Sequence, residues 1–172
     1  MNKTNRRWLV LAVGAVFVAG CGSAAATPSA GAAVRIQVEL PRVQVVAGQT
    51  VSGDAVVTNT TDAPITVTAC PADWLRIGIA NARVTFDPPH SAVLCHPSIT
   101  LAPGPNRFPI TVETTYLLCT GPDGTPTAQA PACVAGDQPP LPAGSYLTKV
   151  VTTGLSNVDT GTPVTVTVLT AP

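Results

Sequence analysis

The side chains of this sequence that could carry out chemistry are mainly cysteines, because the chain has five of them and only two histidines. Cys21 stands near the N-terminus, and the remaining four are Cys70, Cys95, Cys119 and Cys133. A cysteine can form a disulfide, bind a metal, act as a nucleophile or accept a lipid, depending on its compartment and its neighbours. The segment before Cys21 therefore decides how the other four are interpreted.

This segment has the order of an export signal. Three basic residues at positions 3, 6 and 7 precede an apolar run of 12 residues, Trp8 to Ala19. As a helix the run would be roughly 18 Å long, whereas a membrane span needs about 20 apolar residues. Val18-Ala19-Gly20-Cys21 resembles a bacterial lipobox, which implies that Cys21 becomes the first residue and carries lipid on the extracytoplasmic face of the cell membrane. The alternatives are an uncleaved N-terminal anchor and an ordinary secretory signal.

Composition divides the chain into three regions. Residues 1–20 are the predicted lipoprotein signal peptide, and residues 21–33 are the lipidated cysteine with a flexible tether. Residues 23–33 contain only Ala, Ser, Thr, Pro and Gly, so they have no apolar periodicity with which to form a core. Their hydroxyl groups could carry sugars, although a bare spacer is the simpler interpretation. Residues 34–170 are long enough to form one domain with its own core.

Export would place the four later cysteines in an oxidising compartment, where two disulfides are expected. Three pairings are possible. We favour Cys70–Cys95 and Cys119–Cys133, because each of these bridges closes one local excursion of the chain. A zinc site with four cysteine ligands is the alternative, but the sequence has no CxxC pair to support it.

Catalytic and metal sites have little support. Asp87, His90 and His96 are close in sequence, but two histidines and one carboxylate in a proline-rich loop are a weak basis for a metal site. There is no GxSxG motif and no glycine loop that would hold a phosphate. After residue 20 the chain has six Arg and Lys against nine Asp and Glu. The net charge of this part is therefore negative, and this part of the sequence has no cluster of basic residues of the kind that binds nucleic acid. We therefore predict a protein that is not an enzyme and has no metal, cofactor or nucleic-acid partner.

The rest of the sequence predicts strands. Charged residues make up 10% of the chain, against a typical value of about 25%, and Val and Thr, which favour strands, replace many of them. Alternation of apolar and polar residues is clearest from Val34 to Leu40, where the side chains at 34, 36, 38 and 40 would face one way. The other strand-like segments are 43–46, 50–58, 64–69, 74–79, 83–86, 98–101, 107–116, 145–153 and 163–169.

This pattern predicts an all-β fold, an antiparallel immunoglobulin-like sandwich of about seven to nine strands. We expect segments 50–58 and 64–69 to form a hairpin. We also expect the longest strand, 107–116, to have a free edge or a bulge at Pro109, because proline cannot donate to a neighbouring strand.

Candidate binding residues are Trp74, His90 and Tyr116, together with the long segment from Leu117 to Pro142. Trp74 could offer a ring to a ligand, but a single tryptophan beside a cysteine is more often part of a core. A loop as long as 117–142 is often functional, and the alternative is a surface loop that its own disulfide protects.

Three short strings carry a resemblance. They are Val56-Val57-Thr58-Asn59, Ile99-Thr100-Leu101-Ala102-Pro103-Gly104 and Leu141-Pro142-Ala143-Gly144-Ser145-Tyr146. They resemble strands and turns of bacterial immunoglobulin-like envelope domains, and their order is similar to that in the intracellular proteinase inhibitors of bacilli. As a whole the chain resembles small actinobacterial lipoproteins of unknown function. The resemblance places Tyr146 at a tyrosine corner. The antibody-type Cys…Trp…Cys spacing is absent, and no inhibitory residue can be carried over.

Two classes of function follow. The first is a monomeric, lipid-anchored module of the cell envelope that binds another envelope protein or a glycan, or has a structural role, without catalysis. The second is a protease-inhibitor-like module, which the resemblance alone implies.

The lipid anchor can be tested directly. We expect Cys21→Ala to leave the membrane fraction, because it removes the residue that the predicted signal would lipidate. Ser23→Ala, a change two residues away, should stay with the membranes like the wild type. Fractionation of cells measures both variants. If Cys21→Ala remains with the membranes, the apolar run is the anchor and lipidation of Cys21 is wrong.

Overall fold

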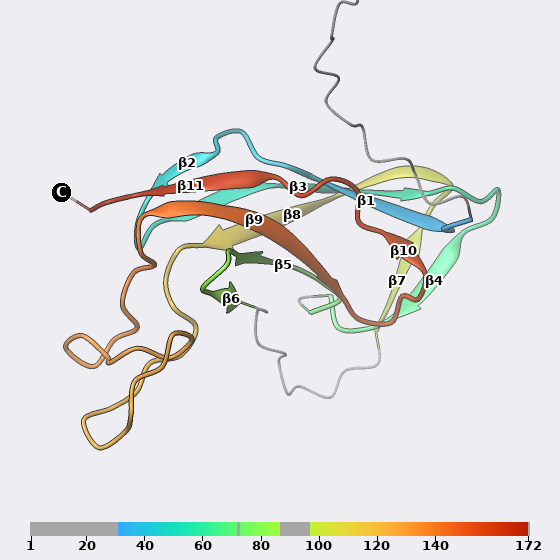
Figure 1. Ribbon diagram of the computed structural model, residues 1–172. Coiled ribbons are helices and arrows are strands. Elements are labelled where there is room, and N and C mark those ends of the chain that lie inside the picture. The colour runs from blue at the N-terminus through green and yellow to red at the C-terminus, as the bar shows by residue number, and fades with distance from the viewer. Residues whose placement is uncertain (1–30, 72, 87–96, 172) are drawn as a thin grey trace, which may run out of the picture.

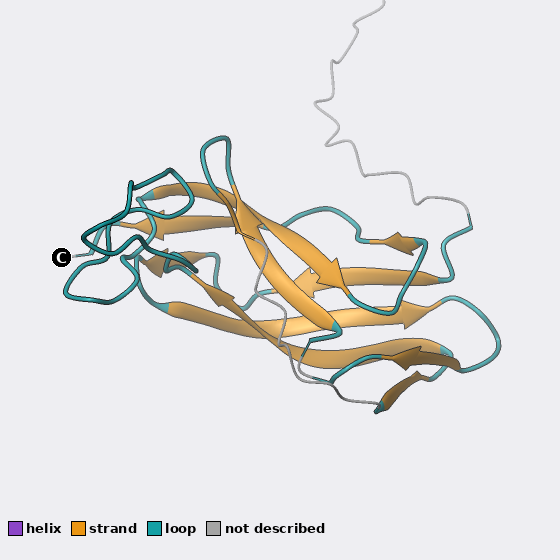
Figure 2. Ribbon diagram, turned by 90° about the horizontal axis from the view of Figure 1, so that it is seen from below, coloured by secondary structure: helices purple, strands orange, loops and turns teal. Residues whose placement is uncertain are grey.

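Two β-sheets face each other across an apolar core in the computed structural model, which describes residues 31–71, 73–86 and 97–171 (Figures 1 and 2). One sheet has the order β10 (Val158–Asp159), β1 (Val34–Glu39), β3 (Thr50–Asn59) and β8 (Gly104–Glu113). The other has the order β2 (Gln44–Val46), β11 (Thr165–Leu169), β9 (Gly144–Thr152), β5 (Leu75–Ala80) and β6 (Thr85–Phe86). A short third sheet pairs β4 (Ile65–Thr68) with β7 (Ser98–Leu101).

The predicted all-β sandwich is confirmed. The alternation of apolar and polar residues along the strands explains why two sheets pack face to face. In β1 the side chains of Val34 and Ile36 are buried while Gln37 and Glu39 are exposed. In β3 Val51, Ala55 and Val57 are all fully buried. One apolar side of each strand therefore faces the opposite sheet, as a period of two residues requires.

The sheets are not purely antiparallel. β1 pairs in parallel with β10, and β2 pairs in parallel with β11. The described residues also form eleven strands rather than about seven to nine, because the sheets gain two- and three-residue strands at their edges. One of them, β10, lies between the predicted strand segments 145–153 and 163–169.

The predicted hairpin of segments 50–58 and 64–69 is wrong. β3 pairs with β1 and β8, whereas β4 pairs with β7. The buried side chain of Asn59 turns the chain between them: its Nδ2 donates to the carbonyl oxygens of Ala63 and Leu101, at 2.8 and 3.1 Å. These bonds direct β4 toward β7 instead of back along β3.

The chain changes sheets after β1. The pairing of β1 with β3 ends at Glu39, two residues before Pro41, and β2 begins in the other sheet beside β11. The crossing passes so close to Gly53 that a Cβ there would clash with the carbonyl oxygen of Glu39, which explains the glycine in a central strand. β8 lies at an edge of its sheet, so Pro109 has the free edge that we predicted.

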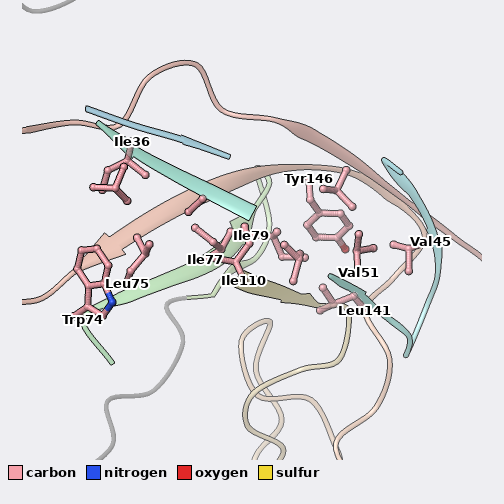
Figure 3. Packing of buried hydrophobic residues seen from close by; sticks show 14 of the residues in the cluster. Ile36, Val45, Val51, Trp74, Leu75, Ile77, Ile79, Ile110, Leu141 and Tyr146 are labelled. Carbon is pink, nitrogen blue, oxygen red and sulfur yellow. The ribbon is translucent and has the colours of Figure 1, made fainter. Parts of the chain in front are cut away.

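The core extends along the whole sandwich, and Figure 3 shows Trp74 at one end and Val45 and Leu141 toward the other. Tyr146, at the start of β9, is 1% exposed, and its hydroxyl donates to the carbonyl oxygen of Pro142 at 2.8 Å. A bond from this tyrosine to the backbone just before its strand is the tyrosine corner of immunoglobulin-like sandwiches. Burial, with a smaller contribution from Tyr116, raises the pKa of Tyr146 above its ordinary value.

Tyr146→Phe should destabilise the domain by about 1 kcal/mol, because Pro142 loses its hydrogen-bond donor. The raised pKa of Tyr146 also makes the free energy of unfolding depend on pH. As the pH rises, the phenol loses its proton in the unfolded state before it does so in the folded state. The contribution of Tyr146 to stability is therefore fully present below about pH 10 and is lost as the pH rises further. The variant should lose less stability than the wild type over that range. Urea unfolding at neutral and alkaline pH measures both effects, and equal alkaline losses would contradict the role of Tyr146.

Candidate functional site

Trp74 is a core residue rather than an exposed ligand platform. Its side chain is 3% exposed, and its ring packs edge-on against Phe108 with 4.7 Å between the centroids. It directly precedes β5, whose inward residues Ile77 and Ile79 continue the same apolar layer. The interpretation of Trp74 as a core residue is confirmed, and its buried ring does not support the alternative of an exposed ligand platform.

The other predicted side chains are not brought together with Trp74. Tyr116 is buried at the end of the core that lies near Leu141, since the backbones of residues 114–116 and 139–141 are hydrogen-bonded there. His90 lies outside the described residues, as do Asp87, His96 and Cys95. Cys70 is disulfide-bonded. Cys95, the partner that we predicted for it, lies outside the described residues, so this pairing stays a prediction.

A cleft of about 460 Å³ lies between β5 and β8, and Tyr116 is part of its wall. The buried Arg76 and the exposed Glu113 give it both charges, while Ile77, Ile110 and Leu117 make part of it apolar. The described residues of the wall include no cysteine, serine or histidine. Nor do the described residues contain a group of three metal-binding side chains.

The segment 117–142 is an ordered loop. The predicted disulfide Cys119–Cys133 is present, with 4.9 Å between the Cα atoms. Beside it the Thr120 amide donates to the carbonyl oxygen of Pro131 at 2.7 Å, and the Cys133 amide donates to that of Thr120 at 3.0 Å. Thr120 Oγ1 donates to the carbonyl oxygen of Ala130 at 2.9 Å. The bridge and these bonds hold both halves of the loop together.

A stem joins the loop to the sandwich. The Tyr116 amide donates to the Pro139 carbonyl oxygen at 2.9 Å, and the Leu141 amide donates to that of Thr114 at 2.8 Å. The side chain of Leu141 is fully buried in the core. Gln138 Nε2 also donates to the carbonyl oxygen of Leu117, at 3.2 Å. The loop is therefore held by its base as well as by its disulfide.

Near the disulfide the chain makes a tight turn. Val134 and Asp137 exchange two backbone hydrogen bonds of 3.0 Å around Ala135 and Gly136. Both central residues have positive φ, 53° and 92°, as a type I′ turn requires. Sequence reasoning missed this turn because its usual signal is Asn-Gly or Asp-Gly, and alanine rarely adopts such a φ.

Exposed apolar side chains flank the bridge. Leu118 is 68% exposed and Val134 is 62% exposed, the two highest values among the large apolar side chains of the described residues. The Sγ atom of Cys119 lies 3.6 Å from the carbonyl oxygen of Asp137, and Asp137 pairs with Val134 across the turn. We call Leu118, Val134 and Asp137 the loop tip.

The loop and the point where the chain enters the sandwich lie at opposite ends (Figure 1). The Thr60 amide, just after β3, donates to the carbonyl oxygen of Ala33, whereas the Gly48 amide, just before β3, donates to that of Thr114. β3 has 10 residues and so is about 30 Å long. The sandwich therefore separates residue 33 from the base of the loop by about this distance.

Comparisons with protein-family models and with curated proteins found no match for this chain. In the part of the chain that the structure describes, no helix is long and apolar enough to span a membrane.

The disulfide should keep the loop ordered without being needed for the sheets. We expect a Cys119→Ser, Cys133→Ser double variant to fold but to lose about 2–3 kcal/mol, since the bridge closes a loop with a sequence separation of 14. Hydrogen exchange should accelerate at the amides of positions 120 and 137 and stay slow at Val57 in β3. Unchanged exchange at positions 120 and 137 would show that the bridge does not order the loop.

Proposed function

We propose that this protein is an exported, lipid-anchored lipoprotein of the cell envelope that acts as a non-catalytic binding module. In this proposal the 117–142 loop is the surface that meets the partner. The observation that carries the proposal is the position of the loop: an ordered loop with exposed apolar side chains lies at the end opposite the chain's point of attachment.

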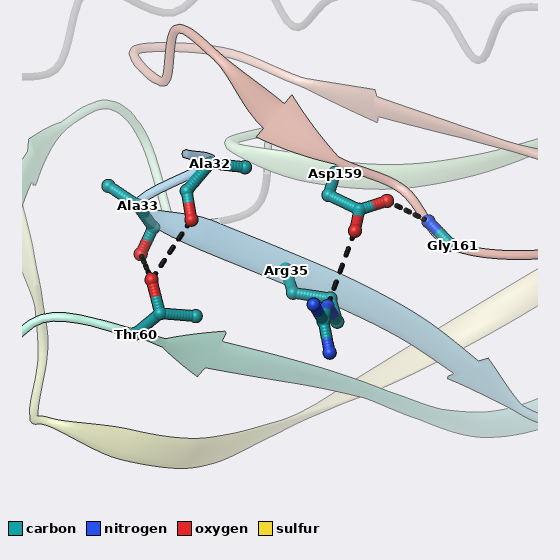
Figure 4. A network of polar contacts seen from close by, with 6 residues as sticks. All are labelled: Ala32, Ala33, Arg35, Thr60, Asp159 and Gly161. Carbon is teal, nitrogen blue, oxygen red and sulfur yellow. Dashed lines mark hydrogen bonds and ion pairs between the residues drawn. The ribbon is translucent and has the colours of Figure 1, made fainter. Parts of the chain in front are cut away.

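Polar contacts fix the attached end, as Figure 4 shows. Thr60 Oγ1 donates to the carbonyl oxygens of Ala32 and Ala33, at 2.9 and 3.1 Å. Arg35 Nε lies 3.3 Å from Asp159 Oδ2, and Asp159 Oδ1 accepts a bond from the Gly161 amide at 3.0 Å. These contacts hold residues 32 and 33 beside the end of β3 and join Arg35 to the turn at 159–161.

This arrangement supports a loop held away from the membrane. If Cys21 carries the lipid, residues 22–33 span at most about 40 Å when fully extended. The end of β3 beside Ala33 is then the end tethered to the bilayer, and the base of the loop lies about 30 Å from that attachment point. A partner in the envelope could reach the loop without competing with the bilayer.

The order of the loop also favours binding. Loops on a rigid sandwich commonly carry recognition, and a loop that is already ordered loses less conformational entropy when it binds. The exposed side chains of Leu118 and Val134 gain free energy when a partner removes them from water.

A protease-inhibitor-like module remains the second proposal. The observation that favours it is the same stem and disulfide, which could hold residues 120–132 rigid in a protease cleft. Incubation with a panel of proteases separates the two proposals: an inhibitor would lower protease activity at stoichiometric amounts, whereas a binding module would leave it unchanged.

Replacing residues 118–137 by a short Gly-Ser turn should abolish capture of the partner while leaving the sheets intact, because it removes the whole loop tip and the disulfide. Crosslinking in intact cells followed by pull-down measures capture, and circular dichroism confirms the fold. Leu147→Ser is the matched control, because Leu147 is 51% exposed but lies on β9, outside the loop. Recovery of every wild-type partner by the shortened variant would contradict the proposal.

A further inference from the structure

We infer that the loop tip recognises a basic protein surface that has an apolar pocket. This inference rests on the proposed function, because it names the kind of partner for the same loop. It follows from the apolar side chains of the tip and from the charge of the loop around them.

The tip presents apolar and acidic groups together. Leu118 adjoins Cys119, whose sulfur contacts the Asp137 carbonyl oxygen, and Asp137 is bonded through its backbone to Val134. The three residues of the tip therefore belong to one small region of the loop. All three are exposed, so one partner surface could cover them at once.

The charged residues of the loop itself have a single sign. Between Thr114 and Thr148 the sequence has two charged residues, Asp123 and Asp137, and no Lys, Arg or His. Both carboxylates are exposed. An acidic loop repels nucleic acid and the anionic surface of a membrane, and it attracts a surface on which Lys or Arg surrounds an apolar centre.

The test places a photo-crosslinking amino acid at position 118, 134 or 147 of the full-length protein in intact cells. We expect protein adducts from positions 118 and 134 but not from the control position 147. The crosslinked peptide of the partner should contain Lys or Arg beside apolar residues. Capture of some protein does not by itself support the inference; the composition of the crosslinked site and the charge variants below must agree with it.

The second measurement uses the crosslinked partner, purified, with the detergent-solubilised full-length protein. Asp123→Asn and Asp137→Asn should each weaken binding about two- to fivefold. Asp62→Asn is the control, since it removes the same charge from an exposed turn at the other end of the sandwich, and it should have no effect. The differences should shrink at about 1 M salt, where charges are screened within about 3 Å. Leu118→Ser should weaken binding about tenfold or more at any salt concentration.

The possible failures are distinguishable. Adducts at 118 and 134 that are insensitive to both aspartate variants would overturn the inferred basic partner and leave the binding loop standing. Adducts to glycan instead of protein would have the same consequence. Absence of adducts at both positions would overturn the inference and the proposed function together.

Discussion

The antiparallel ladder between β3 and β8 is the interaction on which the rest of the structure depends. It joins ten residue pairs without interruption, from Thr50 with Glu113 to Asn59 with Gly104. β1 pairs with the other edge of β3, and the inward side chains of β3 belong to the same core cluster as those of β9 and β11. Because the ladder is continuous, it also fixes the length of the sandwich and keeps its two ends apart.

Each end of the ladder has a different task in this account. At the Asn59 end, bonds from Thr60 hold the chain where it enters the domain. At the Thr50 end, Thr114 continues from β8 into the stem of the long loop. A rigid body with an attachment at one end and an ordered, exposed loop at the other is well suited to presenting that loop, and this geometry is the physical basis of the proposed function.

Much of the fold could be predicted from the sequence, because alternation reports which side of a strand is buried. Alternation located the main strands. The missing donor of proline predicted the edge position of Pro109, the family resemblance implied the tyrosine corner at Tyr146, and the even number of cysteines in an exported domain predicted the disulfide Cys119–Cys133. Alternation does not report which strands are neighbours, and for this reason the predicted hairpin of β3 with β4 was wrong. The side-chain hydrogen bonds of Asn59 instead direct β4 toward β7. The loop tip could not be predicted, because backbone bonds and an unusual Ala-Gly turn form it.

The distance of the loop from the membrane tests the central claim most directly. The full-length lipidated protein would be placed in supported bilayers containing an acceptor dye, with a donor dye at position 62 or at position 125. Position 62 follows β3 at the attached end, and position 125 is an exposed site of the loop. The account predicts strong energy transfer from position 62 and weak transfer from position 125. Equal transfer, or stronger transfer from position 125, would contradict it.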